Sequence, residues 1–149
     1  MSVELHIKAT QKIPLEKKVI IHMMIAENNI KETLSEALKP FDVSVQQFNV
    51  LRILRGQKGR PANMFTIQER MVNKMSNTTR LVDKLVAKSF VNRAVCPSNR
   101  RKVEINITKK GLDALTKMDT IIDNTEKQLL SSFSNKELEQ LNSLLDKFN

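Results

Sequence analysis

Six side chains between residues 76 and 84 are of types that bind phosphates and the edges of base pairs. The set is Ser76, Asn77, Thr78, Thr79, Arg80 and Lys84. The apolar spacing that follows predicts a helix beginning here, with Ser76 as its N-cap. A helix N-terminus favours an anion, and Asn and Arg can hydrogen-bond adenine and guanine edges bidentately. We therefore expect Asn77, Thr78 and Arg80 to contact bases in a major groove.

A second polar group lies at a predicted turn. Residues 90–94 and 102–107 have the alternation or the β-branched side chains of strands, and residues 97–99 between them have the composition of a turn. An arginine near the tip of such a hairpin can enter a narrow, electronegative minor groove, and Arg101 is a better candidate than Arg100. The candidate DNA-contacting set of the hairpin is Asn99, Arg100, Arg101 and Lys102.

The positive charge of the chain is concentrated in this region. Residues 55–110 hold 14 Lys and Arg against three acidic residues, whereas the rest of the chain holds 11 basic and 13 acidic residues. A solvated helix face and an ordinary basic turn would explain each feature alone. Next to each other in one basic segment, the two features favour nucleic acid as the partner. Proteins that bind single-stranded nucleic acid stack its bases on aromatic side chains. The chain has no Trp or Tyr, so duplex DNA is the expected target.

Other classes of function find little support in the residues. One Cys and two His do not supply the usual ligands of a structural zinc ion. We identify no nucleophile–base pair and no Gly-rich phosphate loop, so we expect neither an enzyme nor a cofactor. Cys96 is best interpreted as an inert thiol, with redox-responsive regulation through Cys96 as the alternative. The chain has no run of about 18 apolar residues and no signal-peptide pattern, which predicts a cytoplasmic protein.

The elements that must position these groups are mostly helices. An amphipathic pattern over residues 13–38 predicts a long helix that Pro40 ends. A capping box at Ser44 then predicts a helix that stops before Gly56.

A short helix and a tight break come before the candidate reading helix. Met64 and Phe65 would form a very short strand, and a capping box at Thr66 would begin a helix over residues 67–72. The break at 73–76 joins two helices into a helix-turn-helix, and the hairpin that follows makes it winged. The side chains expected to face inward around the short helix are Ile67, Met71 and Met75.

Two further helices are predicted toward the C-terminus, capped by Thr108 and Ser134. With the first long helix, they present more apolar surface than one small subunit can cover, which predicts a homodimer. The apolar stripes consist of Leu112, Leu115, Met118, Ile122, Leu129 and Leu130 in one helix and Leu138, Leu141, Leu144, Leu145 and Phe148 in the other.

The order and separation of these elements resemble the MarR family of bacterial transcription regulators. The resemblance is carried by Arg80-Leu81-Val82-Asp83-Lys84-Leu85, by Lys88, Val91 and Arg93, by Pro97-Ser98-Asn99-Arg100-Arg101, and by Ile107-Thr108-Lys109-Lys110-Gly111. The chain departs from the family pattern at three points. Glu69-Arg70-Met71 replaces the apolar–Ala pair that is common in the helix before the turn. Asn99 stands where the family usually has Asp, and Ser89 or Phe90 stands where it usually has Gly.

The resemblance implies a mainly α fold, a winged helix-turn-helix with a small β-hairpin wing and a helical dimerisation region. A single domain would span residues 1–149, with 13–39 and 112–149 in the dimerisation region and 44–111 in the DNA-binding region. The family implies a homodimeric, sequence-specific repressor on a palindromic operator, relieved by a small anionic or phenolic effector that changes the spacing of the two reading helices. A sequence-neutral architectural DNA-binding protein of the same fold is the alternative.

Overall fold

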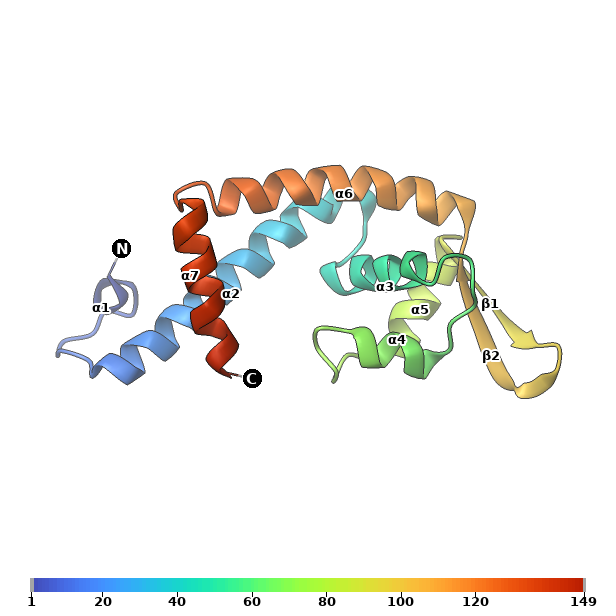
Figure 1. The fold of residues 1–149 in the computed structure, drawn as a ribbon, viewed down its shortest axis with the longest axis horizontal. Coiled ribbons are helices and arrows are strands. Elements are labelled where there is room, and N and C mark those ends of the chain that lie inside the picture. The colour runs from blue at the N-terminus through green and yellow to red at the C-terminus, as the bar shows by residue number, and fades with distance from the viewer. Residues whose placement is uncertain (1, 149) are drawn as a thin grey trace.

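The computed structural model describes residues 2–148, and helices make up most of this part of the chain (Figure 1). In chain order the elements are α1 (Val3–His6), α2 (Leu15–Leu38), the 3₁₀ helix η1 (Lys39–Phe41), α3 (Val45–Gly56), α4 (Met64–Arg70), α5 (Thr78–Ala87), β1 (Val91–Cys96), β2 (Asn99–Ile107), α6 (Lys109–Leu129), α7 (Asn135–Leu145) and the 3₁₀ helix η2 (Asp146–Phe148). A lobe formed by α3, α4, α5 and the hairpin lies at one end, and α2 and α6 extend from it toward α1 and α7. This architecture confirms the predicted winged helix-turn-helix.

The core of the lobe lies where its helices and the hairpin meet. Burying a large aliphatic side chain contributes about 1.5–3 kcal/mol, and here α2, α3, α4, α5, α6 and both strands share one cluster. The reading helix and the wing are therefore held together by packing in a common core. The fully buried members include Leu51 of α3, Ile67 of α4, Leu85 of α5, Ile105 of β2 and Leu115 of α6.

Local capping explains where α3 begins. The Ser44 hydroxyl accepts a hydrogen bond from the Gln47 N–H at 3.1 Å, and the Gln47 side chain accepts from the Ser44 N–H at 2.9 Å. This reciprocal arrangement is the predicted capping box. The helix runs through Gly56, one residue beyond its predicted end.

The start of α4 differs from the prediction. Asn63 is the N-cap, because its side-chain oxygen accepts hydrogen bonds from both the N–H and the hydroxyl of Thr66, at 2.8 and 3.0 Å. Thr66 therefore lies inside the helix, and the predicted capping box at this residue is wrong. Met64 and Phe65 form the first turn of α4 and no strand. The backbone forms an isolated β-bridge two residues before α4. There Ala62 pairs with Ile105 of β2 through hydrogen bonds of 2.9 and 2.8 Å.

The wing is a two-stranded antiparallel hairpin in register from Val91↔Ile107 to Val95↔Val103. Both strands are longer than predicted, and the register shifts between Val95 and Cys96. The base of the hairpin is buried and its outer part is exposed to solvent. The wing is therefore anchored at one end only and projects from the lobe.

Gly111 permits a close approach between the first turn of α6 and the segment that links α5 to β1. A Cβ at this position would lie 2.2 Å from the carbonyl oxygen of Phe90 and 2.9 Å from Cγ1 of Ile107. The same carbonyl accepts a hydrogen bond from the Thr108 N–H at 2.9 Å, and Thr108 caps α6 as predicted by accepting from the Gly111 N–H. Position 111 therefore requires glycine, because there is no room for a Cβ atom.

The helices outside the lobe leave much apolar surface uncovered. In α7, which begins at the predicted Ser134 capping box, none of the residues described is buried. The four-residue α1 is absent from the prediction, since it is too short to show helical periodicity; Val3 in it is buried. The exposed apolar side chains include Leu15, Val19, Ile20 and Met24 of α2 and Leu130, Phe133, Leu141, Leu144, Leu145 and Phe148 near the C-terminus. Within residues 2–148, no helix has the length and apolar character needed to cross a membrane.

Candidate DNA-binding surface

The reading helix α5 is capped one residue later than predicted. The Asn77 side-chain oxygen accepts a hydrogen bond from the Arg80 N–H at 3.1 Å. Ser76 is not the cap, because only 9% of it is exposed and its hydroxyl accepts from the Gln46 amide of α3 at 3.4 Å. Asn and Ser are about equally good N-caps, so packing against α3 decides between them.

Only part of the predicted DNA-contacting set around α5 is exposed to solvent. Thr79, Arg80 and Lys84 are exposed, as is the Asn77 cap. Thr78 is 6% exposed, and its hydroxyl is buried without a hydrogen-bond partner among the residues described. The expectation that Thr78 contacts bases is therefore wrong. Helical spacing already contained the signal, since Thr78 lies three, four and seven residues before the buried Leu81, Val82 and Leu85.

The polar residues of the wing lie on strand β2 and not in the turn. The turn consists of Pro97 and Ser98, and β2 begins at Asn99. The Asn99 side-chain oxygen accepts a hydrogen bond from the Arg101 N–H at 3.1 Å, which orders the start of the strand. Residues Asn99 to Lys102 are all exposed. Because successive side chains of a strand point to opposite faces, Arg100 and Arg101 are expected to lie on opposite faces of the hairpin.

Two ion pairs that the sequence analysis missed hold α5 in place. Arg93 of β1 donates to Asp83 of α5 at 2.5 Å, and Lys88 after α5 donates to Asp42 in the α2–α3 connection at 2.5 Å. The Lys88 ammonium holds the pKa of the Asp42 carboxyl below its usual value. Exposed ion pairs contribute little stability, so their main effect is to orient the reading helix relative to the wing and to the end of α2.

A third ion pair joins the DNA-binding lobe to the long helix α6. The Arg55 guanidinium of α3 donates to both carboxylate oxygens of Asp119, one of them at 3.4 Å. Both side chains are partly buried. The two residues are 64 positions apart, and no local pattern links them. Because this bidentate ion pair has two parallel hydrogen bonds, it restricts rotation of the lobe relative to α6.

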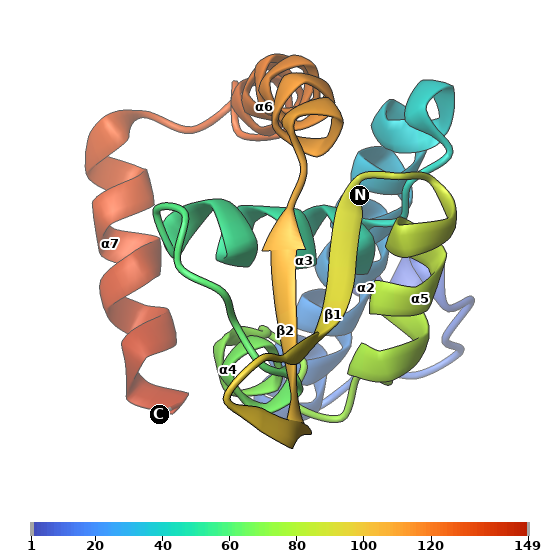
Figure 2. The same cartoon turned by 90° about the vertical axis from the view of Figure 1, so that its right-hand side faces the viewer.

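The N-terminal end of α5, helix α4 and the tip of the wing lie on one side of the molecule. Figures 1 and 2, which view the structure from directions 90° apart, both show these segments at the lower edge, with α6 at the opposite edge. The exposed cations of α5 and β2 are therefore carried by elements that reach the same side. This arrangement suits a duplex whose major groove receives α5 while the wing follows the neighbouring minor groove.

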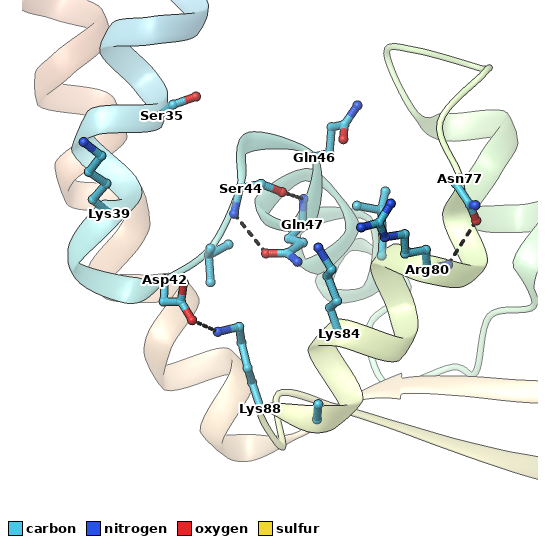
Figure 3. A pocket seen from close by; sticks show the side chains of 13 residues that line it. Ser35, Lys39, Asp42, Ser44, Gln46, Gln47, Asn77, Arg80, Lys84 and Lys88 are labelled. Atoms are coloured by element: carbon cyan, nitrogen blue, oxygen red, sulfur yellow. Dashed lines mark hydrogen bonds and ion pairs between the residues drawn. The ribbon is translucent and has the colours of Figure 1, made fainter.

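A basic pocket adjoins the reading helix. It has a volume of about 790 Å³ and lies between the end of α2, the start of α3 and α5. Figure 3 shows Arg80 and Lys84 of α5 facing Ser44 and Gln47 of α3, with the ion pair between Asp42 and Lys88 at its edge. Cationic groups and the N-terminus of α3 thus line a cavity of a size suited to a small anion.

Cys96 lies at the end of β1 and is partly buried. Its sulfur is 3.2 Å from the hydroxyl of Ser98. Among residues 2–148 no cluster of three or more His, Cys, Asp or Glu side chains could hold a metal ion. The geometry adds no redox partner to the thiol, so its redox role stays a hypothesis.

Comparisons of the sequence and of the structure with known proteins agree with a winged helix-turn-helix. The profile of the MarR family matches residues 43–103, which extend from the start of α3 into the second strand of the wing. The structure is also similar over nearly its whole length to solved regulators of this family, at sequence identities of up to 26% among those described below. Residues 43–103 thus match the MarR family, and solved regulators of that family share the fold of this chain. MarR proteins are transcription regulators, and the chain has their DNA-binding winged-helix fold.

Three solved structures illustrate the similarity. A MarR transcription factor from Planctomyces limnophilus is 26% identical, with a TM-score of 0.72 over 91% of this chain and 98% of that one. A cysteine-to-serine variant of E. coli MarR in complex with operator DNA is 24% identical, with a TM-score of 0.76 over 90% and 94%. An organohalide-sensing transcriptional regulator in its 2,4-dichlorophenol-bound form is 19% identical, with a TM-score of 0.84 over 92% and 80%.

The structure gives a physical account of two of the departures noted in the sequence. Ser89 has a left-handed backbone with φ of 61°, which identifies it as the residue at the position of the usual family glycine. A serine there carries a Cβ penalty that glycine avoids. Asn99 stands where the family usually has Asp, and its side-chain oxygen accepts a hydrogen bond from the Arg101 N–H.

Proposed function

We propose that this chain is a cytoplasmic, sequence-specific repressor of the MarR type that binds a palindromic operator as a homodimer. The observation that carries the proposal is that α5 and the wing reach the same side of the molecule. Arg80 and Lys84 of α5 and Arg101 of the wing are exposed. Cations at these positions neutralise phosphates and release counterions, while the first turns of α5 approach base edges.

The uncovered apolar surface supports the homodimer. Leu15 of α2 is 72% exposed and Phe148 at the C-terminus is 63% exposed, together with several leucines of α7. Apolar side chains exposed in such number on two helices favour an association site. A twofold axis through these helices would place two copies of α5 at half-sites about one helical turn (~34 Å) apart on the DNA.

The basic pocket supports release by a small anionic or phenolic effector. Its wall includes Arg80 and Lys84, which are also candidate DNA contacts. An anion bound there would compete with phosphate for the same two cations and would bias the position of α5. The regulator solved with 2,4-dichlorophenol provides a precedent for phenolic ligands on this fold.

Selection of bound sequences from a random duplex pool tests sequence-specific binding. We expect an enriched motif with twofold symmetry, bound at least about 10³-fold more tightly than random DNA, and a dimeric mass in sedimentation. A specificity ratio near unity would favour the architectural alternative. For the effector, 2,4-dichlorophenol and benzoate should release the selected operator from the wild type, and Lys84→Ala should reduce this sensitivity. Operator binding that neither probe affects would refute the proposed effector class.

A further inference from the structure

The loop between α4 and α5, residues 71–77, displays two apolar side chains to solvent. Its ends are anchored, because Met71 is 2% exposed and Ser76 is 9% exposed. Between these anchors Val72 is 90% exposed and Met75 is 91% exposed. The prediction that Met75 faces inward is therefore wrong, and its side chain is available to a partner.

Hydrogen bonds fix the conformation of this loop. The Asn73 side-chain oxygen accepts from the Met75 N–H at 2.9 Å, and the Asn73 carbonyl accepts from the Ser76 N–H at 3.1 Å. The Gln68 amide of α4 donates to the Lys74 carbonyl at 3.2 Å. Met75 consequently projects from a braced turn whose position relative to α5 is set.

The loop lies at the reading surface. It leads directly into the Asn77 cap of α5, and Figures 1 and 2 both show it on the side of the molecule that carries the wing tip. Lys74 precedes Met75 and Arg80 follows it by five positions, so cations that can hold phosphates flank an apolar side chain. The only apolar group that base pairs present in the major groove is the thymine 5-methyl.

We propose that Met75 is a specificity-determining residue that packs against the 5-methyl group of a thymine in each operator half-site. The inference rests on the proposed sequence-specific DNA binding. Met is well suited to this contact because its unbranched, polarisable side chain adapts to irregular apolar surfaces. Val72 provides a matched comparison, since it is equally exposed in the same loop but lines the cavity between α3 and α4 with Asn49 and Arg52.

The test uses the operator obtained by selection, with each symmetry-related pair of thymines replaced in turn by deoxyuridine, which lacks the methyl group. Burial of one methyl-sized group corresponds to about fourfold in affinity, so two half-sites give about 16-fold. Wild-type protein should lose about this much at one thymine pair. Met75→Ala should lose a similar factor on the unmodified operator and show little further loss at that pair, while Val72→Ala should behave as wild type.

Three outcomes with the Met75→Ala variant would overturn the inference. Met75→Ala could bind the unmodified operator as tightly as wild type, or it could keep the full deoxyuridine penalty at every thymine pair. It could also dissociate into monomers in sedimentation, which would assign Met75 to the subunit interface.

Failure of the inference can be distinguished from failure of the proposed function. A pool that yields no enriched sequence would refute sequence-specific binding itself and the inference with it. An enriched operator that Met75→Ala binds normally would refute the inference alone. Because Met75 is 91% exposed, the variant should melt at the wild-type temperature.

Discussion

Replacing Gly111 by alanine should destabilise the protein, whereas replacing Gly56 should not. Both glycines lie within helices, but a Cβ at residue 56 has no neighbour within 4 Å. A Cβ at residue 111 would lie 2.2 Å from the Phe90 carbonyl oxygen, which is backbone and also accepts the Thr108 N–H. The substitution therefore forces the start of α6 away from the segment that leads into the wing.

The magnitude follows from three terms. Overpacking costs about 1–3 kcal/mol, and weakening the hydrogen bond between Phe90 and Thr108 costs up to about 1 kcal/mol. The higher helix propensity of alanine returns up to about 1 kcal/mol. We expect Gly111→Ala to lower the free energy of unfolding by about 1–3 kcal/mol, and Gly56→Ala to raise it by a few tenths to about 1 kcal/mol.

Urea titration followed by far-ultraviolet circular dichroism measures both variants. The difference between them is the informative quantity, because helix propensity acts in the same direction at both positions. Equal stability of Gly111→Ala and Gly56→Ala would refute the argument from close approach. A stable Gly111→Ala variant with weakened operator binding would show instead that α6 shifts without loss of packing and that the wing moves with it.

Three further substitutions test other parts of the structure. Ser89→Gly should raise the free energy of unfolding by about 0.5–1 kcal/mol, because glycine removes the Cβ penalty at φ 61°; a loss of stability in urea would contradict this. Arg101→Ala should weaken operator binding by about 1–3 kcal/mol with an unchanged Tm, and unchanged affinity in fluorescence anisotropy would remove the wing from the mechanism. Leu144→Asp should give a monomer or an unfolded chain, since a charge would enter a shared apolar surface; a stable dimer in sedimentation would show that α7 is peripheral.

Local signals in the sequence located the longer helices and the hairpin, but not always their first residues. Ser76 and Asn77 are both good caps, and only the burial of Ser76 against Gln46 of α3 decides that Asn77 caps α5. In the same way Asn63 takes the role predicted for Thr66. Where one strong cap stood alone, as at Ser44, the prediction is confirmed.

Contacts between distant parts of the chain could not be predicted from one sequence. The pair of Arg55 and Asp119 joins residues 64 positions apart, and nothing in either local pattern indicates the other. The pair of Asp83 and Arg93 is closer in sequence, but its formation depends on how β1 packs beside α5. The burial of Thr78, by contrast, was available from the apolar spacing and was missed because its polar side chain suggested a surface role.

Hydroxyl-radical footprinting of the selected operator examines the geometry of the complex as a whole. We expect two protected half-sites related by a dyad and separated by about one helical turn, with flanking minor-groove protection that disappears in Arg101→Ala. One continuous stretch of protection without a dyad, or flanking protection that Arg101→Ala leaves intact, would contradict a dimer that places α5 and the wing on adjacent grooves.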